Sequence, residues 1–295
     1  MANLLSNGDD FKNAYNWTAQ QIFHYLTNAA AAYPTRVDLA QLNQRVLQFV
    51  WNDAAIRPGL ARYMNRNVQP AITTWRDPEG GLRPIQMVEV LSAVGYLLSE
   101  TSPIKPIATL PSHGLNYCLP MLAMYAKWCI TICSAVGGWA VCTPPGVVAI
   151  SYVYREGKLE KVLLGVTTSG VPNIRRKCFR FRKDTVMHDV WPDSANRTAP
   201  LNDGVICFED WGHCAETYPL YMLASANAKT KPWVYGKAMN VLSDAEGGGV
   251  ADMNNYNPNE AQGYCRRACE NCRVVIQALG GTVDNFSKDH WGVAK

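Results

Sequence analysis

Residues 147–168 read VVAISYVYREGKLEKVLLGVTT, which is two apolar runs rich in Val, Ile, Leu and Tyr on either side of Glu156-Gly157. β-Branched and aromatic residues favour extended strands, and a polar Glu-Gly pair between two such runs favours a tight turn. We therefore predict a β-hairpin with strands at 147–154 and 159–168. The hairpin decides the fold class, because a helical pattern precedes it and a mixed pattern follows it.

The pattern after the hairpin alternates between helix and strand. We predict a long Arg-rich connection from residue 169 to about 204, a helix at 214–226, a strand at 233–242, a Gly- and Asn-rich loop at 246–262, a helix at 268–279 and a last strand at 282–286. Gly280-Gly281 would end the second of these helices. This order is typical of an α/β sandwich.

The pattern before the hairpin is mostly helical. Apolar residues recur at three- and four-residue steps from Leu39 and again from Val88, and residues 119–136 form an almost uncharged helix that we expect to be central. The stretch 129–154 carries no charge, but glycines and prolines interrupt it too early for a membrane-spanning helix. We predict two domains, a helical N-terminal domain at 1–142 and an α/β domain at 143–295.

The bulk composition is that of a folded protein. The chain has 295 residues, of which 48% are hydrophobic and 18% are charged, and this is enough for two domains of ordinary size. A net charge of +4 permits an anionic substrate without requiring one. With no secretory signal visible, we expect a cytoplasmic protein without membrane contact, in which the ten cysteines are mostly thiols.

Two short motifs carry the chemistry, Gly212-His213-Cys214-Ala215-Glu216 and the run CRRACENC at 265–272. A hydrolytic zinc site needs three protein ligands, an open fourth position for water, and a nearby carboxylate that does not bind the metal. Cysteines at 269 and 272 lie one turn apart at a helix start, where the helix N-terminus favours thiolates. Cys214 supplies a third thiolate and Glu216 supplies the carboxylate.

These motifs resemble the signature of the cytidine deaminase superfamily, which is His or Cys, any residue and Glu, followed later by Pro-Cys-x-x-Cys. The resemblance covers about residues 146–295, and the order of elements agrees with it. It implies a three-layer α/β/α fold and a proton carrier that passes protons from water to the leaving amino group. The implied site is Zn²⁺ on Cys214, Cys269 and Cys272, the proton carrier Glu216, and the backbone of Ala215 against the base.

The match departs from the family pattern in two places. Ala268 stands where the family usually has proline, which would set the helix start. The interval between Cys214 and Cys269 is long, and we assign the excess to the loop at 246–262. The Cys-x-Glu form resembles enzymes that act on cytosine more than relatives that act on adenine.

A basic segment precedes the first motif. Residues 175–183, RRKCFRFRK, interleave two phenylalanines with six cations, a pattern that suits phosphates and stacked bases. The alternative is a strand with a solvated basic face and its phenylalanines in the core. The candidate substrate contacts are Arg175, Arg176, Arg180 and Trp211.

The expected activity is hydrolytic deamination of cytosine to uracil in single- or double-stranded DNA or RNA. A free cytidine or other nucleoside is the alternative substrate. A zinc-stabilised binding module without catalysis is the alternative from another class, with Cys265 as a fourth thiolate in a closed site. His213 is a second candidate ligand beside Cys214, although the spacing to Glu216 favours the cysteine.

Overall fold

The computed structural model of the chain describes residues 4–47, 71–76, 82–87, 89–104, 114–135, 143–168, 172–187, 212–224, 233–243 and 248–288. Its strands are β1 (Ala71–Arg76), β2 (Leu82–Met87), β3 (Val147–Arg155), β4 (Lys158–Val166), β5 (Val234–Asn240) and β6 (Cys265–Arg266). Its α-helices are α1 (Gly8–Ala14), α2 (Ala19–Ala31), α3 (Val37–Leu42), α6 (Val90–Thr101), α8 (Leu119–Ala135), α9 (Pro172–Phe181), α11 (Thr217–Ala224), α12 (Pro258–Gly263) and α13 (Glu270–Ala278). Shorter helical turns are η1 (Asn43–Leu47), η2 (Gly114–Cys118), η3 (Arg182–Met187), η6 (Val250–Asp252) and η7 (Val283–Phe286).

The predicted β-hairpin is confirmed as β3 and β4, which pair antiparallel. Glu156 and Gly157 form its turn with φ values of 50° and 78°, as expected for a tight turn that follows the twist of the strands. The strand predicted at 233–242 is also confirmed, as β5, which pairs antiparallel with the other side of β3. The four-stranded sheet has the order β4-β3-β5-β6, so the described chain is a mixed α/β protein.

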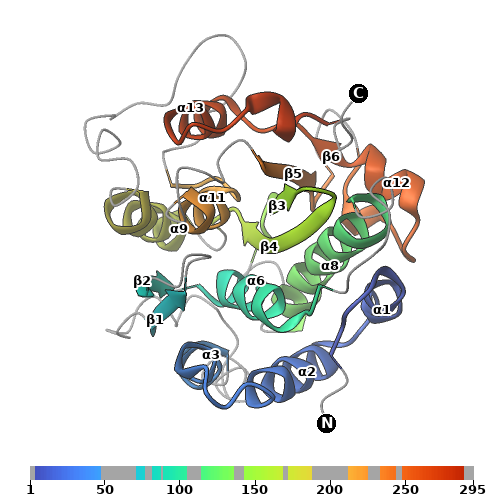
Figure 1. The fold of residues 1–295 in the computed structure, drawn as a ribbon. Helices are drawn as coiled ribbons and strands as arrows, with labels where there is room; N and C mark the ends of the chain where they lie inside the picture. Colours follow the sequence, from blue (N-terminus) through green and yellow to red (C-terminus); the bar gives the residue numbers. More distant parts are fainter. Residues whose placement is uncertain are drawn as a thin grey trace.

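Contacts reach this sheet from both of its faces (Figure 1). On one face, a Cβ added at Gly165 of β4 would lie 2.1 Å from the carbonyl oxygen of Ala215, directly before α11. On the same face, a Cβ at Gly236 of β5 would lie 2.3 Å from the ring of Phe286 in η7. On the other face, α8 contacts β3 and β5. The close approach at Gly165 matters for the site, because it sets the height of the first motif above the sheet.

Helix α6 lies along the outer edge of β4, which is the edge strand of the sheet that the described residues form. The backbone N–H of Leu164 donates to Ser99 Oγ of α6 at 2.9 Å. A Cβ at Gly95 would lie 3.2 Å from the carbonyl oxygen of Leu164, so the helix and the strand are in close contact. An edge strand carries unpaired backbone groups, and α6 both covers them and supplies a partner for one.

Residues from both predicted domains share one hydrophobic core, which extends from Leu5 to Phe286. An ion pair also crosses between them, since Glu100 of α6, which pairs with Arg36 at 2.9 Å within the N-terminal part, also pairs with Lys161 of β4. The division into 1–142 and 143–295 stays a prediction about independent folding. The contacts show that the N-terminal residues are part of the surroundings of the sheet.

The N-terminal part is less uniformly helical than its pattern indicates. The helices predicted from Leu39, from Val88 and at 119–136 correspond to α3, α6 and α8. Between them the chain forms an antiparallel hairpin of β1 and β2, which the sequence interpretation did not include.

Three predictions in the C-terminal part are wrong. The Arg-rich segment, expected as connection or strand, forms helix α9. The region expected as a loop contains η6 and α12. Helix α12 begins at Pro258, and the side chain of Asn257 caps it. Asparagine followed by proline is a common start of a helix, so the sequence contains a signal for α12. The last strand is instead the turn η7, because Phe286 packs on Gly236 and Asn285 Nδ2 donates to the Val234 carbonyl at 3.1 Å.

The central helix was predicted correctly. Among the described residues, Gly114–Ala135 is long and apolar enough to cross a membrane, but 72% of its most apolar window is buried inside the protein. It packs against α1, α2, β3 and α12, so other parts of the chain cover its apolar surface. The cytoplasmic location stays a prediction.

Candidate metal centre

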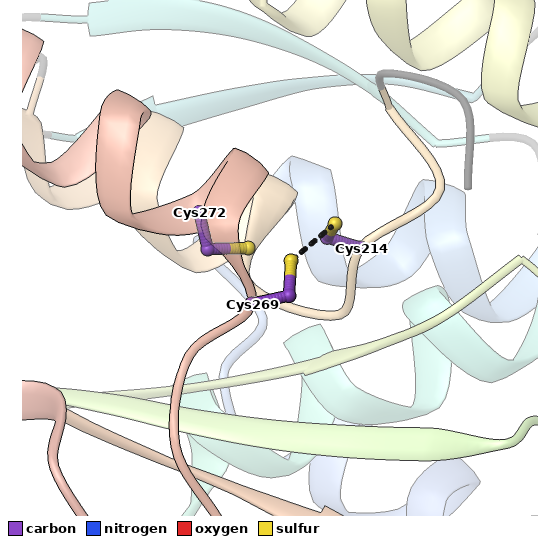
Figure 2. A group of neighbouring side chains, drawn as sticks. All are labelled: Cys214, Cys269 and Cys272. Carbon is purple, nitrogen blue, oxygen red and sulfur yellow. Dashed lines mark hydrogen bonds between the residues drawn. The ribbon is translucent and has the colours of Figure 1, made fainter. Parts of the chain in front are cut away.

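Three cysteines from two distant segments meet at one point (Figure 2). The Sγ atoms of Cys214, Cys269 and Cys272 all lie within 4.8 Å of one another, and those of Cys214 and Cys269 are 3.4 Å apart. Cys214 lies in the turn before α11, Cys269 is the N-cap of α13, and Cys272 lies in the first turn of that helix. The structure therefore brings together the three ligands that the sequence predicts.

The cluster has the dimensions of a thiolate metal site. Sulfur ligands at 2.3 Å from a tetrahedral zinc lie about 3.8 Å from one another, so small shifts would place these sulfurs around one ion. The thiols of Cys214 and Cys269 are partly exposed, whereas Cys272 is buried. Three thiols that are open on one side can hold a metal ion and leave a position for another ligand.

Glu216 lies next to the cluster without joining it. Its Oε2 accepts a hydrogen bond of 3.2 Å from Cys272 Sγ, and the side chain is buried. Burial, together with the neighbouring charge of Cys269, raises the pKa of Glu216 to about 7. The carboxylate is thus close to the sulfurs, but its oxygens are not among the group of ligand atoms that the described residues form.

His213 points toward the end of β4. Its Nδ1 is hydrogen-bonded to Thr168 Oγ1, and its carbonyl accepts from the N–H of Thr168 at 3.1 Å. Burial, together with the charges of Arg182 and Arg175, lowers the pKa of His213 to about 3. His213 therefore stays neutral and fixes the motif to the sheet, and it is outside the cluster that the described residues form.

Cys265 is separate from the other three cysteines. It lies buried in β6, and its thiol donates to the carbonyl of Ala261 at 3.5 Å. In the part of the chain that the structure describes, the cluster has three thiols and Cys265 is not one of them. This geometry disfavours the closed four-cysteine site considered from the sequence.

Comparisons with protein-family models, with curated proteins and with solved structures found no match.

The proposed contacts of the substrate are placed only in part. Arg175 and Arg180 are exposed on α9, while Arg176 belongs to the same helix. Trp211 lies outside the described residues. Ala215 is buried with its carbonyl against Gly165, so a role of its backbone toward a base stays a prediction.

The first motif rests on the end of α9. Gly212 has φ of 90°, a value that favours glycine, and a Cβ there would lie 2.4 Å from the carbonyl oxygen of Phe179 and 2.9 Å from the nitrogen of Lys183. The basic helix and the three-cysteine cluster are therefore neighbours, which the sequence order alone does not establish.

Arg182 is the residue that sequence reasoning missed. It belongs to the basic run at 175–183, whose cations the sequence pattern predicts to face phosphates or solvent, but it is fully buried and donates to the Cys214 carbonyl at 3.3 Å. The sequence spacing contains a signal for this burial, because Cys178, Arg182 and Val186 follow one another at four-residue steps. In the structure all three side chains are buried. That spacing places Arg182 on the apolar face of the helical segment.

Proposed function

We propose that this protein is a zinc-dependent hydrolase that deaminates cytosine, with Zn²⁺ on Cys214, Cys269 and Cys272. The observation that carries the proposal is the convergence of these three thiols with the Glu216 carboxylate, which lies 3.2 Å from one of them. Three ligands and an adjacent carboxylate that does not bind the metal are the parts that a hydrolytic zinc site needs.

Glu216 is the residue that moves the proton. When bound, zinc supplies a water molecule of lowered pKa. Glu216 would take one proton from that water and pass it to the ring nitrogen of the base. As the added hydroxyl becomes the new carbonyl group, Glu216 would take its remaining proton and pass it to the departing amino group, which leaves as ammonia. Its burial excludes bulk water from the carboxylate, so the proton passes between water and substrate within the site.

The arrangement of elements supports a deaminase-like fold as part of the same proposal. The hairpin β3–β4 precedes the helix of the first motif, strand β5 lies between the two motifs, and helices contact both faces of the sheet. We propose that these are the three layers of a deaminase-like domain. The described residues after α13 form η7 where the sequence pattern predicted a further strand.

Exposed cations near the centre support a polynucleotide substrate. The charge of Arg175 lowers the pKa of His213, and the charge of Arg266 lowers the pKa of Glu216, so both arginines lie close to the site. Arg180 adds a third exposed cation on α9. Phosphates on either side of a target cytosine would be attracted to such groups, whereas a free cytidine would make less use of them.

The proposal is tested by metal analysis and by an assay for conversion to uracil. The variants are Glu216→Gln and, as a matched control, Glu270→Gln, which changes a buried carboxylate that pairs with Arg273 at the start of α13. Cytidine, single-stranded DNA, double-stranded DNA and RNA are offered to each protein. We expect about one zinc per chain in all three proteins, and a loss of activity of about 10²- to 10⁴-fold only in Glu216→Gln.

Each outcome has a distinct meaning. Zinc with no conversion of any substrate would reduce the site to a structural or binding role and end the deaminase proposal. A chain without zinc would end the metal assignment itself. Equal activity on cytidine and on polynucleotides would remove the argument for nucleic acid and leave a nucleoside deaminase.

A further inference from the structure

A buried arginine connects the metal cluster to the N-terminal helices. Arg182 is fully inaccessible, and its guanidinium donates to four acceptors on three segments of the chain. A buried charge is tolerated only where it is paired and hydrogen-bonded, so these contacts define the place of the side chain closely. The acceptors are Glu89 Oε2 at 3.0 Å, Ser92 Oγ at 3.1 Å, the Val166 carbonyl at 2.8 Å and the Cys214 carbonyl at 3.3 Å.

Two of the acceptors belong to the surroundings of the metal cluster. Cys214 provides one of the three sulfurs, and Val166 is the last residue of β4. The Cys214 carbonyl also accepts from the N–H and the hydroxyl of Thr217, at 3.3 and 2.9 Å. Arg182 is thus a donor to this carbonyl from outside the first motif, and it ties the motif to the end of the strand.

The other two acceptors belong to the start of α6. Glu89 is the N-cap of that helix and pairs with Arg182 at 2.9 Å, and Ser92 donates to the same carboxylate at 3.0 Å. The guanidinium also lies 5.1 Å from the ring centre of Tyr218 in α11, which adds a cation–π contact. Arg182 therefore pairs with residues at the start of α6 and also donates to the backbone of the first motif.

We propose that Arg182 is a positioning residue that fixes the backbone of the metal ligand Cys214, and that Glu89 of α6 orients Arg182 for this task. The inference rests on the proposed metal site. It assigns a role in metal binding to the N-terminal region, because the geometry of one ligand depends on a carboxylate 125 positions earlier in the sequence. Outer groups that orient a ligand contribute substantially to metal affinity.

The test uses the full chain and measures metal binding directly. Zinc affinity is obtained by competition with a chromophoric chelator, and the absorption spectrum of the Co²⁺-loaded protein reports the geometry of the thiolate ligands. The variants are Arg182→Met, Arg182→Lys and Glu89→Gln. The matched control is Arg36→Met, which removes another guanidinium that pairs with a carboxylate of α6 but contacts Asp38, Tyr96 and Glu100 instead of the motif.

We expect Arg182→Met to weaken zinc binding by about 10- to 100-fold and to change the Co²⁺ spectrum. Arg182→Lys should bind zinc more tightly than Arg182→Met, because it keeps the positive charge. It should bind zinc less tightly than the original protein, because an ammonium reaches fewer of the four acceptors. Glu89→Gln should shift the Co²⁺ spectrum while the arginine is retained. Arg36→Met should leave both affinity and spectrum as in the original protein.

Unchanged affinity and spectrum in folded Arg182→Met would overturn the proposal. If that variant does not fold, Glu89→Gln decides, and an unchanged Co²⁺ spectrum there would overturn it equally. An effect of the same size in Arg36→Met would show general destabilisation and would also end the inference. Failure of the original protein to bind zinc or cobalt would instead remove the metal site on which the inference rests.

Discussion

Gly165 shows how a single residue sets the geometry of the centre. A Cβ at this position would lie 2.1 Å from the Ala215 carbonyl oxygen and within 2.8 Å of the ring of Pro219. We predict that Gly165→Ala destabilises the fold by about 1–3 kcal/mol, because backbone and a rigid ring cannot move aside easily. Since Ala215 separates Cys214 from Glu216, zinc affinity should fall as well.

Urea unfolding and zinc competition measure these two effects. Gly146→Ala is the matched control, since nothing lies within 4 Å of a Cβ there. A stability of Gly165→Ala equal to that of the control would show that the sheet and the motif are further apart than the structure has them.

At the scale of elements, a partly buried ion network joins α3 to α6. Asp38 accepts two hydrogen bonds from Arg36, at 2.9 and 2.6 Å, and one from Tyr96 at 2.8 Å. Burial raises the pKa of Asp38, but the bonds from Arg36 and Tyr96 outweigh it, so the pKa is below its ordinary value. The stabilisation is therefore present above the pKa of the unfolded state and is lost as the pH falls through the folded-state pKa.

We predict that Asp38→Asn lowers the free energy of unfolding by about 2 kcal/mol at neutral pH. The difference from the original protein should be constant from pH 8 to about pH 5 and should shrink below about pH 4. Denaturant unfolding across this range measures it, with Asp9→Asn as the control because Asp9 is exposed in its pair with Lys12. A difference that persists unchanged at low pH would show that the carboxylate charge does not contribute.

At the scale of the whole molecule, a metal ion would join the two segments that carry the motifs. A ligand that binds only the folded state adds about 4 kcal/mol when its free concentration is a thousand times its Kd. We therefore predict that chelation of zinc lowers the Tm by several degrees and that re-addition restores it. Thermal unfolding with and without a chelator measures the shift.

Two cysteine variants test whether the zinc-dependent shift in Tm requires the three clustered thiols or any buried thiol. Cys272→Ser should abolish the zinc-dependent shift in Tm, because it removes one of three ligands. Cys265→Ser should preserve the shift, because that thiol binds a backbone carbonyl outside the cluster. Loss of the shift in Cys265→Ser would contradict the three-cysteine assignment.

The sequence determined the elements whose pattern is local. The hairpin β3–β4, the strand β5 and the helix α8 follow from runs of strand-forming or helix-forming residues and from the turn at Glu156-Gly157. The cysteine spacing at 269 and 272 likewise determined that two sulfurs lie at one helix start. The periodicity was harder to see in the basic run, where Cys178 of α9 and Arg182 of η3 are buried on one face of the helical segment.

The contacts between these elements depend on how the whole chain folds. Local preferences do not encode which helix covers the edge of β4, or that Arg182 leaves the solvent to join Glu89 and Cys214. Such contacts join residues 32 and 93 positions apart, and they form because a buried charge must find partners wherever the folded chain supplies them. The sequence pattern thus indicates the three candidate ligands, and the folded chain shows how the backbone of one of them is held.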